Sequence, residues 1–150
     1  MKIKCPEFDN GGVIPERFTQ YDENRSLPLN FEDVPADAQS LVLIMDDPDA
    51  PNGTFTHWIA FNIDPNTSGF RENHIPRDVR LGTNDKGRAD YAGLRPPSGE
   101  HRYFIWVYAL DCRLDLAHAS TRSDIERAMV GHVVAEAELM GRFAAPINGA

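Results

Sequence analysis

The stretch HRYFIWVYALD, residues 101–111, is the strongest strand prediction in the chain. Aromatic and β-branched residues dominate it, and these types favour pleated, half-buried strands. Because side chains alternate across a strand, His101 and Tyr103 should share one face with Ile105. Two polar rings would then stand together at the start of an otherwise apolar face. We expect this segment to be a central strand.

Working outward, two further segments predict central strands. The run SLVLIM (40–45) is continuously apolar, which is typical of a strand covered on both faces. The run THWIAFNI (56–63) predicts a second. Three weaker strand predictions are VIPERFTQY (13–21), SLPLNFEDVP (26–35, closed by Pro35) and a short edge strand within IPRDVRLGTND (75–85).

The C-terminal part of the chain has a helical pattern. Ser123, followed three residues later by Glu126, matches a capping box. Apolar residues then recur at helical spacing as far as Phe143. This pattern predicts one amphipathic helix over residues 123–143. The fold class that follows is mainly β: an antiparallel β-sandwich with a C-terminal amphipathic helix.

Length and charge limit the classes of protein. A chain of 150 residues fits one domain, 1–150. Its net charge of −8, from 15 basic and 23 acidic residues, argues against a nucleic acid partner, which needs a basic footprint. The same charge disfavours docking on anionic lipid surfaces.

Compartment and cysteine use are also expectations from the sequence. No stretch has the apolar length of a transmembrane segment, and no signal peptide is visible, so we expect a cytoplasmic protein. Cys5 and Cys112 lack metal-site spacing, and we expect free thiols rather than a disulfide.

Polar residues stand at the ends of the three central strand predictions. Asp47 follows the first run, whereas His57 and His101 lie at the beginnings of the other two. If the Asp47 strand runs antiparallel to both histidine strands, the three ends meet at one sheet edge. Each residue alone is commonly a core histidine or a turn carboxylate, but their coincidence favours a site. Alternation along the second strand predicts His57 on one face with Ile59 and Phe61.

Two proline-containing loops adjoin these strand ends. MDDPDAP (45–51) holds three carboxylates and two prolines, and PPSG (96–99) runs directly toward His101. Prolines stiffen a loop and remove N–H donors, while Gly99 permits close backbone approach. Such a loop can direct backbone N–H groups toward a ligand.

These motifs together resemble a known family. DPDAP (47–51), then a strand with a His followed by an aromatic residue, then G-x-x-P-P-x-G-x-HRY (93–103), is similar to the phosphatidylethanolamine-binding proteins, also called Raf kinase inhibitor-like proteins. The resemblance runs from about residue 12 to residue 145, and the ending VYALD resembles the bacterial and archaeal branch. Leu27, between Ser26 and Pro28, and Leu94, where the family has proline, depart from the pattern.

The resemblance implies a β-sandwich with a small preformed pocket at one end that binds phosphate-type anions. Matching positions assign the ligand-binding role to Asp47, His57, Arg95, Pro96, His101 and Tyr103. They assign structural support to Asp49, Pro51, Gly99 and Arg102. Arg102 is expected to pair with Asp49, and the Ala50–Pro51 peptide is expected to be cis.

The leading hypothesis is therefore non-catalytic binding of a phosphate-type anion or of a phosphoethanolamine-like phospholipid headgroup. Regulation of a partner protein, such as a kinase or a protease, is a further expectation, and a homodimer stays open. Asp47 should repel an anion. Either it orients a histidine and favours the charged ring, or it accepts a hydrogen bond from a protonated phosphate oxygen or an ammonium.

Two other classes compete with this hypothesis. The first is a small hydrolase or metal-dependent enzyme that uses the same His, Asp and Tyr cluster. No serine or cysteine nucleophile stands out in the motif, and no paired histidine spacing occurs, so we expect neither catalysis nor metal nor cofactor. The second is a purely structural or interaction protein.

Overall fold

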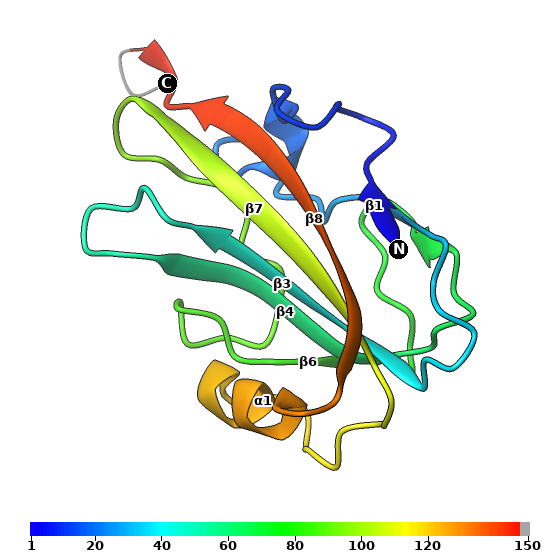
Figure 1. Cartoon of the computed structure of the whole chain (residues 1–150). Helices are drawn as coiled ribbons and strands as arrows, with labels where there is room; N and C mark the ends of the chain where they lie inside the picture. The colour runs from blue at the N-terminus through cyan, green and yellow to red at the C-terminus, as the bar shows by residue number, and fades with distance from the viewer. Residues whose placement is uncertain (148–150) are drawn as a thin grey trace.

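The computed structural model describes residues 1–147 and has two antiparallel sheets (Figure 1). The larger sheet has the order β6-β4-β3-β7-β8. Its strands are β3 (Ser40–Asp47), β4 (Phe55–Ile63), β6 (Arg80–Leu81), β7 (Glu100–Leu110) and β8 (Val133–Ala144). The smaller sheet has the order β1-β2-β5, with β1 (Lys2–Lys4), β2 (Leu29–Glu32) and β5 (Gly69–Phe70).

Strand β3 is the centre of the larger sheet. Every one of its residues is buried, which confirms the prediction that this apolar run is covered on both faces. It pairs antiparallel with β4 on one side and with β7 on the other. This is the topology that brings the end of β3 to the starts of the two histidine strands.

The larger sheet has apolar side chains on both faces. The main core joins the two sheets: Phe31 of β2 and Phe70 of β5 belong to the same buried cluster as Leu43 of β3. A smaller cluster on the other face packs Ile44 and neighbouring side chains against Ile125 of the helix α1 (Arg122–Met129). Two antiparallel sheets and a helix are thus present, and the sandwich arrangement stays a prediction.

The prediction of one helix over 123–143 is wrong beyond its second turn. The helix α1 ends at Met129, and the chain then turns at Gly131, whose φ is +81°. Glycine in the left-handed region is a common helix terminator, because other residues are strained there. The N-cap also differs: Thr121 Oγ1, not Ser123, accepts the backbone N–H of Asp124 at 3.1 Å.

The segment that follows α1 is the longest strand of the sheet. β8 pairs antiparallel with β7 along nearly its whole length. Its C-terminal half alternates, with Leu139, Gly141 and Phe143 buried between partly exposed neighbours. Several of the same residues also fit a helical spacing, so the sequence pattern alone does not separate a strand from a helix here.

The weaker predictions had mixed outcomes. The segments 26–35 and 75–85 contain β2 and β6, and β6 is an edge strand as expected. The segment 13–21 is not a strand, because Glu16–Phe18 form a 3-10 turn. Cys5 and Cys112 are free thiols, as predicted. Within the described residues, no helix combines the length and the apolar character needed to cross a bilayer.

Candidate functional site

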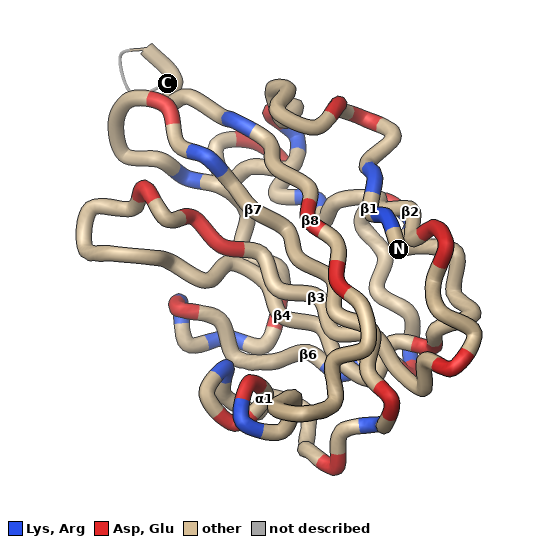
Figure 2. Tube along the Cα trace, viewed as in Figure 1, with Lys and Arg blue, Asp and Glu red and all other residues tan. Residues whose placement is uncertain are grey.

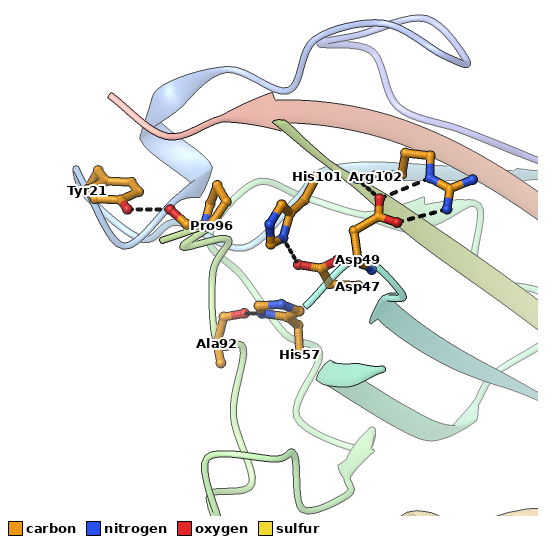
Figure 3. Close-up of polar contacts among 8 residues, drawn as sticks. All are labelled: Tyr21, Asp47, Asp49, His57, Ala92, Pro96, His101 and Arg102. Carbon is orange, nitrogen blue, oxygen red and sulfur yellow. Dashed lines mark hydrogen bonds and ion pairs between the residues drawn. The ribbon is translucent and has the colours of Figure 1, made fainter. Parts of the chain in front are cut away.

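The end of β3 and the start of β7 meet in a buried hydrogen bond between two side chains. His101 Nδ1 lies 2.6 Å from Asp47 Oδ2, and both side chains are almost completely buried (Figure 3). A carboxylate oxygen only accepts hydrogen bonds, so Nδ1 carries the hydrogen. The other ring nitrogen of His101, Nε2, is then left for a ligand.

The three carboxylates of MDDPDAP each have a different partner. Asp47 pairs with His101, and its Oδ1 also accepts the backbone N–H of Asp49 at 2.8 Å. Asp46 points to the opposite face and pairs with Arg122 of α1. Asp49 pairs with Arg102 outside the site. Only one carboxylate of this segment therefore lines the site.

A β-bulge in β4 places His57. The register pairs Met45 with Trp58 but Asp46 with Thr56, so β4 has one extra residue, His57, at this point. Trp58 consequently lies in the main core, whereas Ile59 lies in the cluster beneath α1. The prediction that His57 shares a face with Ile59 and Phe61 is wrong, because it assumed uninterrupted alternation.

The bulge turns the His57 ring toward the β7 side of the site. Its centroid lies 5.5 Å from that of Tyr103, and its Nδ1 lies 2.8 Å from the carbonyl oxygen of Ala92. Burial lowers the pKa of His57 below its usual value. The ring is therefore neutral near pH 7, with its hydrogen on Nδ1 and an accepting lone pair on Nε2.

Tyr103 lies behind the two histidines. Its ring stacks on that of His101, with centroids 6.4 Å apart. Its hydroxyl is buried and has no hydrogen-bond partner among residues 1–147. Burial, together with the negative charge of Asp47, raises the pKa of Tyr103, so the hydroxyl stays protonated. An unused donor thus stands beside the Asp47–His101 pair.

A cavity of about 190 Å³ opens over these groups. Of the residues assigned to binding, Asp47, His57, Arg95 and His101 line it, together with Pro51 from the support set. Pro96 and Tyr103, also assigned to binding, do not line it. The remaining lining residues are Gln20, Ala50, Phe55, Lys86 and Pro97. Ala50 and Pro97 belong to the two loops that the sequence singled out, and Phe55 starts the strand of His57. Gln20 and Lys86 were missed, because they reach the cavity from segments that no local pattern connects with it.

The second proline of PPSG, Pro97, lines the cavity, and the first, Pro96, anchors the loop. The carbonyl oxygen of Pro96 accepts the Tyr21 hydroxyl at 2.6 Å (Figure 3). Gly99 has a φ of +67°, the left-handed conformation that glycine adopts without strain, and its carbonyl accepts the N–H of Ala145. The loop is thus tied to segments on both sides.

Two cations lie at the cavity without an acidic partner. Lys86 Nζ donates to Gln20 Oε1 at 2.6 Å, and the Arg95 guanidinium stands 5.6 Å from the centroid of the Tyr21 ring. Neither makes an ion pair with any other residue between 1 and 147. These charges are free to attract an anion.

Arg102 and Asp49 brace the outer side of the site. Arg102 Nε and Nη2 donate to the two carboxylate oxygens of Asp49 at 2.9 and 2.8 Å, and its backbone N–H adds a third bond (Figure 3). These hydrogen bonds lower the pKa of Asp49 to about 2. The Ala50–Pro51 peptide is trans, so the expectation of a cis bond is wrong.

Two other features of the surface do not combine a cavity with the histidines and the unpaired cations of this site. A larger hollow of about 420 Å³ lies between β1 and β8, and no histidine lines it. A group of three His, Cys, Asp or Glu side chains close enough to share a metal ion occurs in the described residues, but none of its members lines the cavity.

Fold and site together define the class: an antiparallel two-sheet protein with a small cavity where one central strand ends and two others begin. Comparison with known sequences agrees and is more specific. The profile of the family described as phosphatidylethanolamine-binding protein matches residues 4–144, and the chain belongs to this family.

Individual relatives support the assignment. The chain is 47% identical over 149 residues to a UPF0098 protein of Methanothermobacter thermautotrophicus, covering 95% of this chain and 98% of that one. The crystal structure of a phosphatidylethanolamine-binding protein homologue from Chlamydia trachomatis has a TM-score of 0.93 and 36% identity, covering 97% of each chain. Escherichia coli YbcL, with a TM-score of 0.88 and 22% identity over 97% of this chain and 98% of that one, shares the fold.

Proposed function

We propose that the cavity binds a phosphate-type anion, free or as a phosphomonoester headgroup, without catalysing a reaction on it. One observation carries the proposal: a buried Asp47–His101 pair and a neutral His57 line a cavity that also holds the unpaired cations Lys86 and Arg95.

The hydrogen-bonding groups complement a phosphate in its monoprotonated form. Lys86 and Arg95 bring positive charge to the lining, and the Tyr103 hydroxyl, a donor that lacks an acceptor, lies behind the two histidines. The Nε2 of His57 is an acceptor, which suits a P–OH group. Such a site supplies donors for the charged oxygens and one acceptor for the protonated oxygen.

The geometry favours one solution to the problem of Asp47 beside an anion. Both of its carboxylate oxygens already accept a hydrogen bond, one from His101 and one from the backbone of Asp49. Asp47 therefore acts through His101. Its carboxylate fixes the imidazole ring, so that the ligand meets the Nε2 nitrogen of His101 rather than a carboxylate oxygen of Asp47. This arrangement favours the phosphate end of a phosphoethanolamine-like ligand over its ammonium.

Size limits the ligand to a small group. Pockets for drug-sized molecules occupy about 300 to 1,000 Å³. A cavity of about 190 Å³ fits a phosphate or a short headgroup, and acyl chains would lie outside it.

Calorimetric titration with inorganic phosphate and with phosphoethanolamine tests the proposal. We expect one site per chain with both ligands, and His101→Ala should abolish binding while circular dichroism shows an intact fold. The matched control is His74→Ala, which removes an exposed histidine elsewhere and should bind normally. Normal binding by the His101→Ala protein would show that the cavity is not the binding site.

The enzyme hypothesis and the partner hypothesis have their own measurements. Turnover of a phosphomonoester by the wild-type protein, lost in His101→Ala, would replace non-catalytic binding by hydrolysis. Regulation of a partner protein such as a kinase or a protease is proposed only by analogy with the family resemblance. A partner captured equally well by wild-type and His101→Ala protein would separate that role from anion binding.

A further inference from the structure

The end of the β7–β8 hairpin nearest α1 brings three metal-ligating residue types together. Asp111 and Cys112 directly follow β7, and His132 directly precedes β8. The pairing of Leu110 with Val133 places the two segments side by side, as Figure 1 shows beside α1. One ligand atom from each of the three side chains lies within 4.8 Å of the other two.

The backbone holds these residues in place. The N–H of Asp111 donates to the carbonyl oxygen of His132 at 3.0 Å, and the N–H of His132 donates to that of Met129 at 2.9 Å. Ser40 Oγ, at the start of β3, donates to the carbonyl oxygen of Cys112 at 2.6 Å. Three elements therefore position the ligands before any ion arrives, which lowers the cost of ordering them.

We propose that Asp111, Cys112 and His132 bind a divalent transition-metal ion of the zinc class. Thiolate, imidazole and carboxylate are the ligands that zinc uses, whereas magnesium and calcium prefer oxygen ligands alone. Three protein ligands leave one tetrahedral position, which water fills. The exposed side chains of Asp111 and His132 leave the ion an open path from solvent.

Binding changes the protonation of the ligands. The Cys112 thiol loses its proton to solvent, because the thiolate is the form that binds metal. His132 Nδ1 now lies 2.7 Å from Asp111 Oδ1. This hydrogen bond gives way to bonds from the two side chains to the ion, with the imidazole in its neutral form.

The metal site is separate from the anion cavity. His101 lies at one end of the 11-residue strand β7, and Asp111 follows the other end. At about 3.4 Å per residue the two sites are on the order of 30 Å apart. The metal site can therefore be tested independently of the proposed function.

Cobalt(II) is the probe, because a thiolate bound to this ion gives a charge-transfer band in the near ultraviolet. Titration of the full chain with Co²⁺ under a phosphine reductant should give this band, saturating at one ion per chain, with visible bands of tetrahedral geometry. Zn²⁺ should displace Co²⁺ and remove both the charge-transfer band and the visible bands. Light scattering during the titration should show an unchanged molecular mass.

Substitutions identify the ligands. Cys112→Ser should abolish the charge-transfer band, and the matched control Cys5→Ser, at a buried thiol far from these residues in sequence, should keep it. His132→Asn should weaken Co²⁺ binding about 100-fold or more, whereas His74→Asn should not. Zn²⁺ should raise the Tm of the wild-type protein and leave that of Cys112→Ser unchanged.

Several results would overturn the proposal. One is the absence of the band at stoichiometric Co²⁺, which would leave Asp111 and His132 as a hydrogen-bonded pair at the surface only. A band that survives Cys112→Ser would assign the ion to other ligands. One ion per two chains, with a doubled mass, would show a bridge between molecules instead of this site.

Discussion

The Tyr103 hydroxyl is buried, yet nothing in the described part of the chain accepts its hydrogen. A buried polar group without a partner costs about 1 to 3 kcal/mol of stability. A hydrogen bond from this hydroxyl to a charged ligand would contribute about the same amount of free energy to binding. We therefore expect Tyr103 to lower the stability of the free protein and to strengthen a complex with an anion that reaches its hydroxyl.

Substitution Tyr103→Phe should therefore separate stability from binding. We expect the free energy of unfolding in urea to rise by about 1 kcal/mol, because an unsatisfied donor is removed. The affinity for inorganic phosphate should fall about tenfold, because a donor to the anion is lost. A variant that is less stable and binds normally would contradict both parts of the argument.

His57 predicts a pH dependence of stability. Burial lowers its pKa in the folded protein from an unfolded value of 6.5, so the unfolded chain takes up a proton first as the pH falls. The free energy of unfolding should therefore decrease as the pH is lowered from about 6.5 to the pKa that His57 has in the folded protein. Below that pKa it should level off. Thermal melts of wild type and His57→Gln across this range should differ in slope, the variant being flatter.

The Asp49–Arg102 pair predicts a second, more acidic transition. The pKa of Asp49 is lowered to about 2, so its contribution is present above about pH 4 and is lost as the pH falls toward 2. Because both side chains are partly exposed, we expect that contribution to be about 1 kcal/mol or less. Asp49→Asn should remove this step in acid unfolding. An unchanged acid profile for the variant would show that the pair does not stabilise the fold.

At the scale of elements, Gly131 decides where the helix stops and the strand begins. Its φ of +81° is strained for other residues, but nothing lies within 4 Å of the position that a Cβ would occupy. Gly131→Ala should lower the free energy of unfolding by about 1 kcal/mol, for conformational reasons alone. Gly131→Asn should lose less, because asparagine tolerates this conformation. Equal losses in urea titrations would contradict this explanation.

Strand β8 is the element that the sequence least revealed, and its removal should be severe. Truncation after Arg122 deletes β8 together with all but the first residue of α1, and it exposes the edge of β7 and the apolar side chains on both faces of the larger sheet. We expect aggregation or unfolding, seen by light scattering and circular dichroism. Truncation after Ala145 keeps β8 and the bond from Ala145 to Gly99, and should melt as wild type. A folded, soluble short form would contradict the structural role of α1 and β8 together.

At the scale of the whole molecule, the net charge of −8 governs encounters. Acidic residues lie on the loops at several sides of the molecule and along β8 (Figure 2). Long-range repulsion should therefore keep the chain off anionic bilayers, while Lys86 and Arg95 attract small anions locally. The proposal thus favours free headgroups over membrane surfaces.

Cosedimentation with phosphatidylserine-containing vesicles tests whether the protein avoids anionic bilayers. The measurement is made at low salt, where electrostatic effects are largest. We expect the protein to stay in the supernatant, while phosphoethanolamine binding in solution is retained. Recovery of the protein with the vesicles would show that a local feature overrides the net charge.

Much of this protein follows from its sequence. Apolar run length and β-branched content predicted β3, β4 and β7, because burial and side-chain shape act locally along a strand. The motif residues Asp47, His57 and His101 were singled out by their places at strand ends, and the structure brings them to one cavity. The resemblance to the family rested on the same residues.

The tertiary structure alone decided the rest. A bulge in β4 turned His57 to the face of Tyr103, and Lys86 reached the cavity from a turn 29 positions further along the chain. Pairing with β7 made a strand of a tail whose spacing also suited a helix. The physical reason is common to all three: register and long-range packing depend on partners distant in sequence, which local periodicity does not contain.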